Sequence, residues 1–219
     1  MMGLEAIAAI NRDHGLRVQR EIIDKMGPKW FEQRKTTDDS SYRYLLSHIP
    51  GETRGWTLEL GARDGSAYPL LVELGFEPTF GVDVLEEYVL LGRAEGRALK
   101  TSCMECLPFA TGMFNCVVSR HSLEHTANPL ETVREAARVL VPGGYSAHVV
   151  PAFKGSETEP AHLTNWSWSQ WFKLWRQHGF NEVWHEHTNK YADRELHMVF
   201  QKEAGTELER SVSEGSIGR

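Results

Sequence analysis

The sequence predicts an α/β fold, built on an open sheet of parallel strands with helices on its faces. A short apolar run, 56–60, breaks into Gly61-Ala-Arg-Asp-Gly65, and a stretch compatible with a helix follows at 66–74. A second apolar run, 78–82, then ends on Asp83. Further along the chain, apolar runs keep alternating with amphipathic stretches, which is the order of βαβ units. These observations favour a doubly wound parallel sheet.

The glycine turn and Asp83 predict a ligand. In an open parallel sheet, ligands bind in the crevice at the carboxyl ends of the strands. Gly61 and Gly65 let the backbone turn sharply and lie against a ligand, and the next helix adds free N–H donors. The carboxylate of Asp83 can accept hydrogen bonds from both hydroxyls of a ribose. The glycines do not fit the dinucleotide pattern G-x-G-x-x-G, and the P-loop pattern is absent.

Length and composition suit one soluble α/β domain with some additional chain. The chain has 219 residues, of which 41% are hydrophobic and 25% charged. The net charge of −6 argues against a dedicated nucleic-acid binder. The 3 cysteines make no disulfide framework, and no stretch approaches the roughly 20 apolar residues that span a bilayer. We therefore expect a cytoplasmic protein with no membrane partner; the oligomeric state stays open.

Two helical segments are predicted before the glycine turn. Apolar residues at helical spacing between 4 and 23 predict a first helix, which Gly27-Pro28 ends. A second, shorter helix is predicted from 39 or 40 to 48. Residues 1–52 belong to no βαβ unit, so we interpret them as a helical extension packed on the main domain, 53–202.

The chain after Asp83 alternates again. It predicts a helix over 85–92, a short strand over 98–102, a strand over 111–118, a helix over 129–140 and a strand over 145–150. Asn128 can cap the second of these helices, and Pro129 suits its first position. Pro142-Gly143-Gly144 is expected to end that helix and to turn the chain into the next strand.

The last part of the chain predicts a helix and a hairpin. Ser167 and Gln170 form a capping-box pattern, which opens a helix ending at Gly179. One face of this helix carries four aromatic side chains, namely Trp168, Trp171, Phe172 and Trp175. We interpret this face first as a core face, and stacking on an aromatic substrate is the alternative. Two strands follow, over 180–187 and 195–201, and residues 203–219 are polar and predicted to be disordered.

Five motifs stand in the order and at the intervals of one known family. They are Glu59-x-Gly61-x-x-x-Gly65, Asp83, a Leu-Pro-Phe loop at 107–109, Leu-Glu-His at 123–125 and Arg-Val-Leu-Val-Pro-Gly-Gly at 138–144. Together they resemble the type-11 methyltransferase domain family of class I S-adenosyl-L-methionine (SAM) methyltransferases. The resemblance covers residues 57–151.

The resemblance implies a Rossmann-like, doubly wound, seven-stranded sheet with a C-terminal antiparallel hairpin. It implies SAM as cofactor and methyl transfer to an O, N or C acceptor. In the family, N-terminal extensions often cover the cofactor and shape the acceptor pocket; here, covering only a sheet edge stays open as the alternative. The residues that the resemblance assigns to the cofactor are Glu59, Gly61, Ala62, Gly65, Asp83, Val84, Met104, Glu105 and Arg120.

Within this set, three residues have distinct expected roles. Glu59 favours the positive end of the cofactor, and Asp83 holds its ribose. Met104 is expected to pack on the adenine face, because its sulfur is polarisable, with filling a gap in the core as the alternative.

Three residues depart from the family pattern. Arg63 replaces the usual middle glycine, and its side chain must point away from the sulfonium, because two cations repel. Cys103 replaces an acid that commonly lies beside the adenine amino group, and Asn115 replaces an aspartate. These departures keep an alternative open, namely a SAM-binding protein without catalysis, acting as a sensor or an inactive partner subunit. A dinucleotide oxidoreductase is disfavoured by the glycine spacing.

Two histidines are candidate catalytic residues. His121 starts the loop at the carboxyl end of the fourth strand, and His162 lies in the polar loop after the fifth. A histidine has an unperturbed pKa of about 6.5, so either can act as a general base. No [DNS]-P-P-[YF] motif is present, and with an acidic chain the expected acceptor is a small molecule rather than a nucleic acid.

No metal is predicted. Cys103-x-x-Cys106 lacks the second close pair that a structural zinc site needs. His121 and His125 stand four residues apart, but the acid between them is not at the position that the metalloprotease pattern H-E-x-x-H requires.

Overall fold

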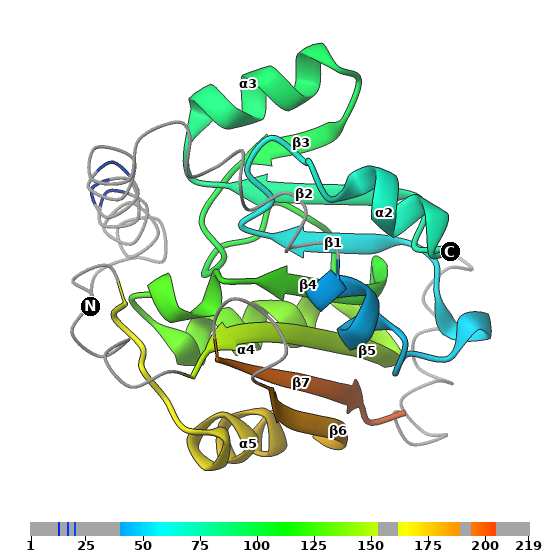
Figure 1. Cartoon of the computed structure of the whole chain (residues 1–219), viewed down its shortest axis with the longest axis vertical. Helices are drawn as coiled ribbons and strands as arrows, with labels where there is room; N and C mark the ends of the chain where they lie inside the picture. Colours follow the sequence, from blue (N-terminus) through cyan, green and yellow to red (C-terminus); the bar gives the residue numbers. More distant parts are fainter. Residues whose placement is uncertain are drawn as a thin grey trace, which may run out of the picture.

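The computed structural model describes residues Asp13, Arg17 and Arg20, and the ranges 40–152, 162–188 and 194–204. Within these ranges one seven-stranded sheet has the order β3-β2-β1-β4-β5-β7-β6 (Figure 1). Its strands are β1 (Thr57–Leu60), β2 (Thr79–Asp83), β3 (Ala98–Thr101), β4 (Phe114–Arg120), β5 (Leu140–Pro151), β6 (Phe180–Thr188) and β7 (Glu195–Lys202).

The topology is that of a doubly wound sheet with an antiparallel hairpin at one edge. Strands β1 to β5 pair in parallel, and the strand order reverses between β1 and β4. Strand β7 inserts antiparallel between β5 and β6, from Tyr145 opposite Gln201 to Pro151 opposite Glu195. Both the seven-stranded sheet and the C-terminal hairpin predicted from the sequence are confirmed.

Helices cover both faces of the sheet. They are α2 (Tyr68–Glu73), α3 (Glu86–Ala94), α4 (Pro129–Val139) and α5 (Trp168–Gln177), with short 3₁₀ helices η1 (Gly51–Thr53) and η2 (Leu123–His125). Residues 40–46 are also helical. One buried cluster joins α4 and α5 to the sheet, and a second joins α2, α3 and residues 42–49 to its other face. The core therefore has two layers, one on each side of the sheet.

Strand β4 lies at the centre of both layers. Val117 belongs to the cluster under α4 and α5, whereas Cys116 and Val118 belong to the opposite cluster, and all three are fully buried. A strand buried on both faces reads as a continuous apolar run, as the sequence does here.

Local helix signals act as predicted. The Oδ1 atom of Asn128 accepts a hydrogen bond of 3.3 Å from the N–H of Glu131, and Pro129 opens α4. The capping box of Ser167 and Gln170 opens α5. Two tryptophans of the aromatic face, Trp171 and Trp175, are fully buried, which confirms it as a core face.

Gly143 and Gly144 were expected between a helix and a strand, but they lie inside strand β5. Helix α4 ends at Val139, one residue before its predicted end, and β5 begins at Leu140 rather than at 145. Phe114 pairs with Leu140, and Cys116 pairs with Tyr145, so residues 141–144 form a bulge inside the strand. Gly143 supplies the positive φ of 80° that this bulge uses.

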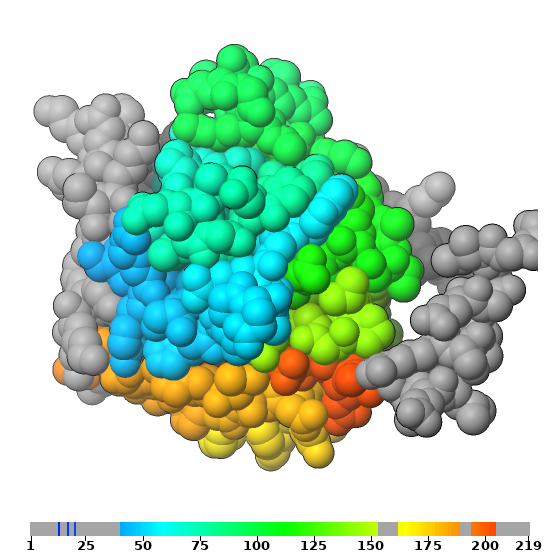
Figure 2. All heavy atoms as spheres, turned by 90° about the vertical axis from the view of Figure 1, so that its right-hand side faces the viewer, coloured from blue at the N-terminus to red at the C-terminus, as the bar shows by residue number. Residues whose placement is uncertain are grey.

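The second predicted N-terminal helix is confirmed at 40–46, and Tyr42, Leu45 and Leu46 are buried in the core. Figure 2 shows residues 40–55 at the surface between α2 and β6. Arg43 is bonded to Glu73 of α2, and Tyr44 to Glu186 of β6. Of the first predicted helix, the three described positions are helical.

The rest of that first helix and most of the predicted disordered tail, 205–219, lie outside the described residues. Among the helices that are described, none has the length and apolar character needed to cross a membrane.

Candidate functional site

The predicted ligand residues lie at the carboxyl ends of β1, β2 and β4. These three strands are neighbours in the sheet, and the strand order reverses between β1 and β4. In open α/β sheets the ligand binds outside the carboxyl ends of the strands at such a reversal. Gly61 follows β1, Asp83 ends β2, and His121 follows β4.

The glycine turn is a left-handed segment. Gly61, Arg63 and Gly65 have φ values of 68°, 52° and 74°. A Cβ atom at Gly61 would lie 2.2 Å from Oγ of Ser122, in the loop after β4. Glycine is therefore required at Gly61 both for its backbone conformation and for the close approach of that loop.

Asp83 fixes the turn. Its Oδ2 accepts a hydrogen bond of 2.8 Å from the N–H of Arg63, and its Oδ1 accepts one of 2.9 Å from the N–H of Leu85. Burial raises the pKa of Asp83, against the lowering effect of these backbone donors. Since a carboxylate oxygen accepts two hydrogen bonds, each oxygen keeps capacity for a second donor, such as a ribose hydroxyl.

Glu59 is a buried carboxyl with one unmatched oxygen. Oη of Tyr42 donates a hydrogen bond of 2.8 Å to its Oε1. Its Oε2 is buried and has no hydrogen-bond partner within the described ranges. Burial is the main cause that raises the pKa of Glu59 to about 8. The side chain is thus prepared to gain a donor or a positive charge.

The cation of Arg63 is held on the side of α3. Its guanidinium lies 5.5 Å from the centroid of the Tyr88 ring, which belongs to that helix. This contact is consistent with the expectation that the side chain does not reach toward the ligand's positive centre.

Other predicted cofactor residues line two loops and the end of β4. Oε1 of Glu105 accepts hydrogen bonds from Oγ1 of Thr126 at 2.7 Å and from the N–H of Ala127 at 3.1 Å, so Glu105 ties its loop to the segment after η2. Met104 packs against the core cluster under α4 and α5. The guanidinium of Arg120 lies 5.9 Å from the centroid of the Tyr42 ring.

His121 lies between two glutamates. Its Nε2 is 2.8 Å from Oε1 of Glu195, and its Nδ1 is 3.5 Å from Oε1 of Glu124. Burial by itself lowers the pKa of His121, but the bonds to both glutamates outweigh it, and the pKa is raised. Each ring nitrogen faces a carboxylate. The ring is therefore suited to carry a positive charge and to stay fixed between the two glutamates, and it is not suited to abstract a proton from a substrate.

Glu195 was not predicted from the sequence, yet it connects three distant segments. Its Oε2 accepts a hydrogen bond of 2.8 Å from Oγ of Ser41 and lies 2.8 Å from Nε2 of His197. Together with His121, these contacts join the helix 40–46, strand β7 and the loop after β4. No local pattern marks Glu195, because all its partners except His197 are far away in the sequence.

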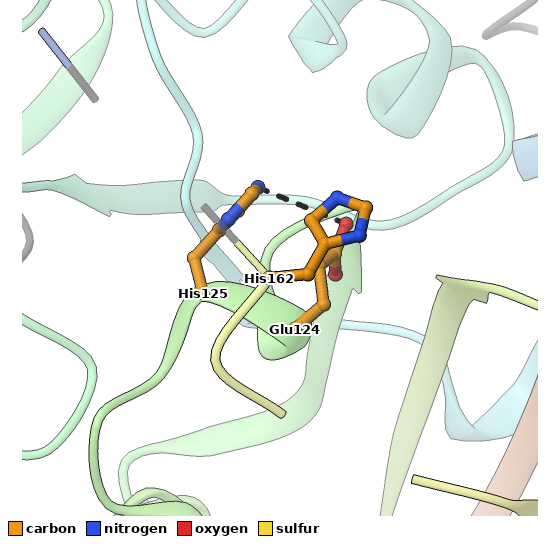
Figure 3. A group of neighbouring side chains, drawn as sticks. All are labelled: Glu124, His125 and His162. Atoms are coloured by element: carbon orange, nitrogen blue, oxygen red, sulfur yellow. Dashed lines mark ion pairs between the residues drawn. The ribbon is translucent and has the colours of Figure 1, made fainter. Parts of the chain in front are cut away.

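His162 lies beside η2 (Figure 3). The N–H of Thr164 donates a hydrogen bond of 3.0 Å to the carbonyl of Glu124, and this contact brings the segment after β5 against the loop after β4. The rings of His125 and His162 have centroids 5.3 Å apart. The two predicted catalytic histidines, His121 and His162, are thus both neighbours of Glu124.

The sequence model of the family described as methyltransferase domain matches residues 31–210. The chain belongs to the methyltransferase domain family. This membership agrees with the class I SAM-dependent methyltransferase, with SAM as cofactor, that the sequence motifs predicted.

Solved structures, some of them described as methyltransferases, share this fold at low sequence identity. One is a chain from the complex of the Haloferax volcanii Trm112 methyltransferase activator with a protein provisionally described as a methyltransferase; it has a TM-score of 0.67 and 18% identity, over 87% of this chain and 97% of that one. Another is an S-adenosylmethionine dependent methyltransferase from Mesorhizobium loti, with a TM-score of 0.62 and 14% identity, over 74% and 97%. A third, the [4+2]-cyclase SpnF, has a TM-score of 0.66 and 15% identity, over 76% and 81%.

A curated relative matches in part. An uncharacterized protein of Methanocaldococcus jannaschii is 31% identical to this chain over 117 residues. The matched region covers 53% of this chain and 53% of the relative. The chain therefore spans about half the length of the curated relative that it matches.

The residues at the glycine turn fit the cofactor. SAM carries a positive sulfonium and a ribose with two hydroxyl groups. The unmatched, buried Oε2 of Glu59 suits the positive charge, and the remaining acceptor capacity of Asp83 suits the hydroxyl groups. The side-chain-free backbone at Gly61 and Gly65 allows close approach.

Proposed function

We propose that this methyltransferase transfers a methyl group to an O, N or C atom of a small molecule. The observation that carries the proposal is the buried Oε2 of Glu59, which has no partner in the described part of the chain and lies beside a turn fixed by Asp83. A buried carboxyl oxygen without a partner is costly, and a bound cation compensates it.

Bound SAM supplies the electrophilic methyl group of the reaction. The protein has to hold the acceptor atom in line with it and exclude water. In our proposal Glu59 and Asp83 hold the cofactor, and the turn at Gly61, Ala62 and Gly65 gives it backbone contact. The remaining cofactor residues follow the family assignment: Val84, Met104, Glu105 and Arg120.

The two candidate histidines have different roles in this proposal. His121 is a positioning residue, because Glu195 and Glu124 face its two ring nitrogens. His162 comes from the segment after β5, where we place the acceptor, and is half-buried. As a general base, His162 would take a proton from an acceptor amine or hydroxyl during methyl transfer.

Charge supports a small-molecule acceptor. The chain has a net charge of −6. Glu124, His125 and His162 are among the described side chains on the acceptor side. A nucleic-acid site needs lysines and arginines to neutralise phosphates. Glu124 is the buried acid of this group, and it disfavours an anionic acceptor.

Two measurements test the proposal. Calorimetry should detect binding of SAM or S-adenosylhomocysteine and none of NAD(P). Labelled SAM is then offered with three separate pools, namely extracted metabolites, total RNA and total protein. Label in the metabolite pool supports a small acceptor, whereas label only in RNA or protein contradicts it. The Asp83→Ala variant is the control for label that does not come from this site.

Two departures from the family pattern, Arg63 and Cys103, favour a second function. The [4+2]-cyclase SpnF has the same fold, so the fold by itself does not fix the reaction. A protein that binds SAM without transferring its methyl group would show saturable binding but form no S-adenosylhomocysteine with any pool. That result would support the sensor or partner-subunit alternative.

A further inference from the structure

Glu124, His125 and His162 form a cluster of metal-ligand side chains (Figure 3). Each can offer one ligand atom, and these three atoms lie within 4.8 Å of one another. Nε2 of His125 is 3.8 Å from Oε1 of Glu124. Two imidazoles with one carboxylate are the ligand set of several catalytic zinc sites.

The carboxylate of Glu124 has an atom available for a ligand. The side chain is buried, with 1% of the residue exposed. Its Oε2 has no hydrogen-bond partner in the part of the chain that the structure describes. A buried carboxylate oxygen is normally bonded, so this atom calls for a donor or a cation.

Backbone contacts hold the two loops of the cluster together. The N–H of Thr164 bonds to the carbonyl of Glu124 at 3.0 Å, and Oγ1 of Thr164 bonds to the carbonyl of Thr126 at 3.0 Å. Thr164 itself is buried. These bonds place His162 beside η2 without any help from the three ligand side chains.

We propose that Glu124, His125 and His162 bind one divalent transition-metal ion of the zinc class. Ligand bonds of 2.0–2.2 Å around a tetrahedral ion place the ligand atoms about 3.3 Å apart. The cluster therefore has to contract by at most about 1.5 Å at its widest pair, which rotations of the two half-buried histidines can supply. Three protein ligands leave a fourth position for water or for a substrate atom.

His121 supports this site from outside the ligand set. Its Nδ1 lies 3.5 Å from Oε1 of Glu124, so it restrains the carboxylate, as the outer partners of metal ligands do. A His162 that binds a metal cannot also take a proton. The metal site therefore excludes the general-base role proposed above for His162, and the two roles can be separated by experiment.

The sequence predicted no metal, because His121-x-x-x-His125 has the wrong order and Cys103-x-x-Cys106 has no second pair. The cluster depends instead on His162, which follows a different strand and reaches Glu124 only in the folded chain. Metal binding at this cluster requires neither SAM nor a particular methyl acceptor.

The test uses the full chain without a histidine tag, freed of metal by a chelator and titrated with Zn²⁺ against a chromophoric competitor. We expect one tight site per chain. Glu124→Gln and His162→Ala should each weaken binding by more than about 100-fold, since changes outside the ligand set already cost 10–100-fold. His187→Ala removes an exposed histidine of β6 and should change affinity by less than about twofold. Co²⁺ should give the visible absorption of a four-coordinate ion, and the His162→Ala variant should lose it.

Circular dichroism melting identifies any variant that fails to fold, and His162→Gln then replaces His162→Ala. The proposal is overturned if the wild type does not compete for Zn²⁺, or if His187→Ala weakens binding as much as His162→Ala. SAM affinity is measured on the same samples. SAM binding with no Zn²⁺ binding would reject the metal site and leave the proposed function standing. Zn²⁺ binding with no SAM binding would support the metal site and contradict the proposed function.

Discussion

Oη of Tyr42 donates a hydrogen bond of 2.8 Å to Oε1 of Glu59, across a buried contact between the helix 40–46 and strand β1. Burial, together with the nearby Glu59, raises the pKa of Tyr42 well above its usual value, so the phenol remains a donor. One oxygen of Glu59 is thus fixed from the N-terminal side. The segment before the predicted main domain therefore contributes a side chain that contacts a predicted cofactor residue.

Tyr42→Phe should weaken both folding and cofactor binding. Removing the hydroxyl leaves Oε1 of Glu59 without its donor, and we expect the free energy of unfolding to fall by about 1–2 kcal/mol. Urea denaturation measures this change, and calorimetry should show SAM affinity reduced several-fold. Tyr44→Phe is the matched control, because Tyr44 bonds to Glu186 of β6 instead. Equal losses of SAM affinity in both variants would contradict a specific role for Tyr42.

SAM affinity should rise with pH until Glu59 is ionised. Burial raises the pKa of Glu59 from 4.5 to about 8, so in the folded protein the carboxyl is protonated below that value. The cation prefers the ionised form, and binding below about pH 8 must release the proton. We expect affinity to increase by up to about tenfold per pH unit between about pH 6 and pH 8. Calorimetry in buffers of different ionisation enthalpy measures the proton release.

The raised pKa of Glu59 also makes the stability of the cofactor-free protein depend on pH. Between pH 4.5 and about 8 the folded state keeps a proton that the unfolded state loses, so the Glu59 contribution to the free energy of unfolding falls as pH rises. Glu59→Gln removes both effects and is the control for any other group that titrates in this range. A pH dependence of SAM affinity that persists in Glu59→Gln would show that another group is responsible.

Asp83→Ala should lose cofactor binding and also lose stability. The sequence alone predicted only lost ribose contacts, but the N–H groups of Arg63 and Leu85 also depend on this carboxylate. Two unsatisfied N–H groups cost about 2–4 kcal/mol of unfolding free energy, measured by urea denaturation without SAM. Glu87→Ala removes an exposed acid of α3 and should leave SAM affinity almost unchanged. If Asp83→Ala keeps full affinity, another residue holds the ribose.

The parts of the fold that were predictable depend on neighbours in the sequence. Gly61 and Gly65 mark a left-handed turn, Asn128 marks a helix start, and the alternation of apolar runs marks the sheet. Each signal is read within a few residues, because it reports a backbone conformation or a buried face. Even the error at Gly143 is local: a turn between a helix and a strand was expected there, and a bulge with a positive φ occurs instead.

The parts that were missed depend on pairs far apart in the chain. Tyr42 meets Glu59, and Ser41 meets Glu195, only after the helix 40–46 has packed on the sheet. A buried glutamate gives no local signal of its own, since its partner can lie on any neighbouring element. The sequence placed His121 at the end of β4 but could not show that Glu195 faces it.

Glu195→Gln should destabilise the protein while leaving the cofactor residues in place. Glu195 is 4% exposed and faces His121, His197 and Ser41, and the bonds that it accepts lower its pKa against the effect of burial. Removing one charge from a buried pair leaves the other uncompensated, so we expect a loss of about 3–5 kcal/mol in the free energy of unfolding. Glu203→Gln, an exposed change after β7, should stay within about 0.5 kcal/mol of the wild type. Urea denaturation compares the two variants, and calorimetry with SAM at a temperature where both are folded should give equal affinities. A stable Glu195→Gln variant would mean that His121 is neutral or that Glu124 alone compensates its charge.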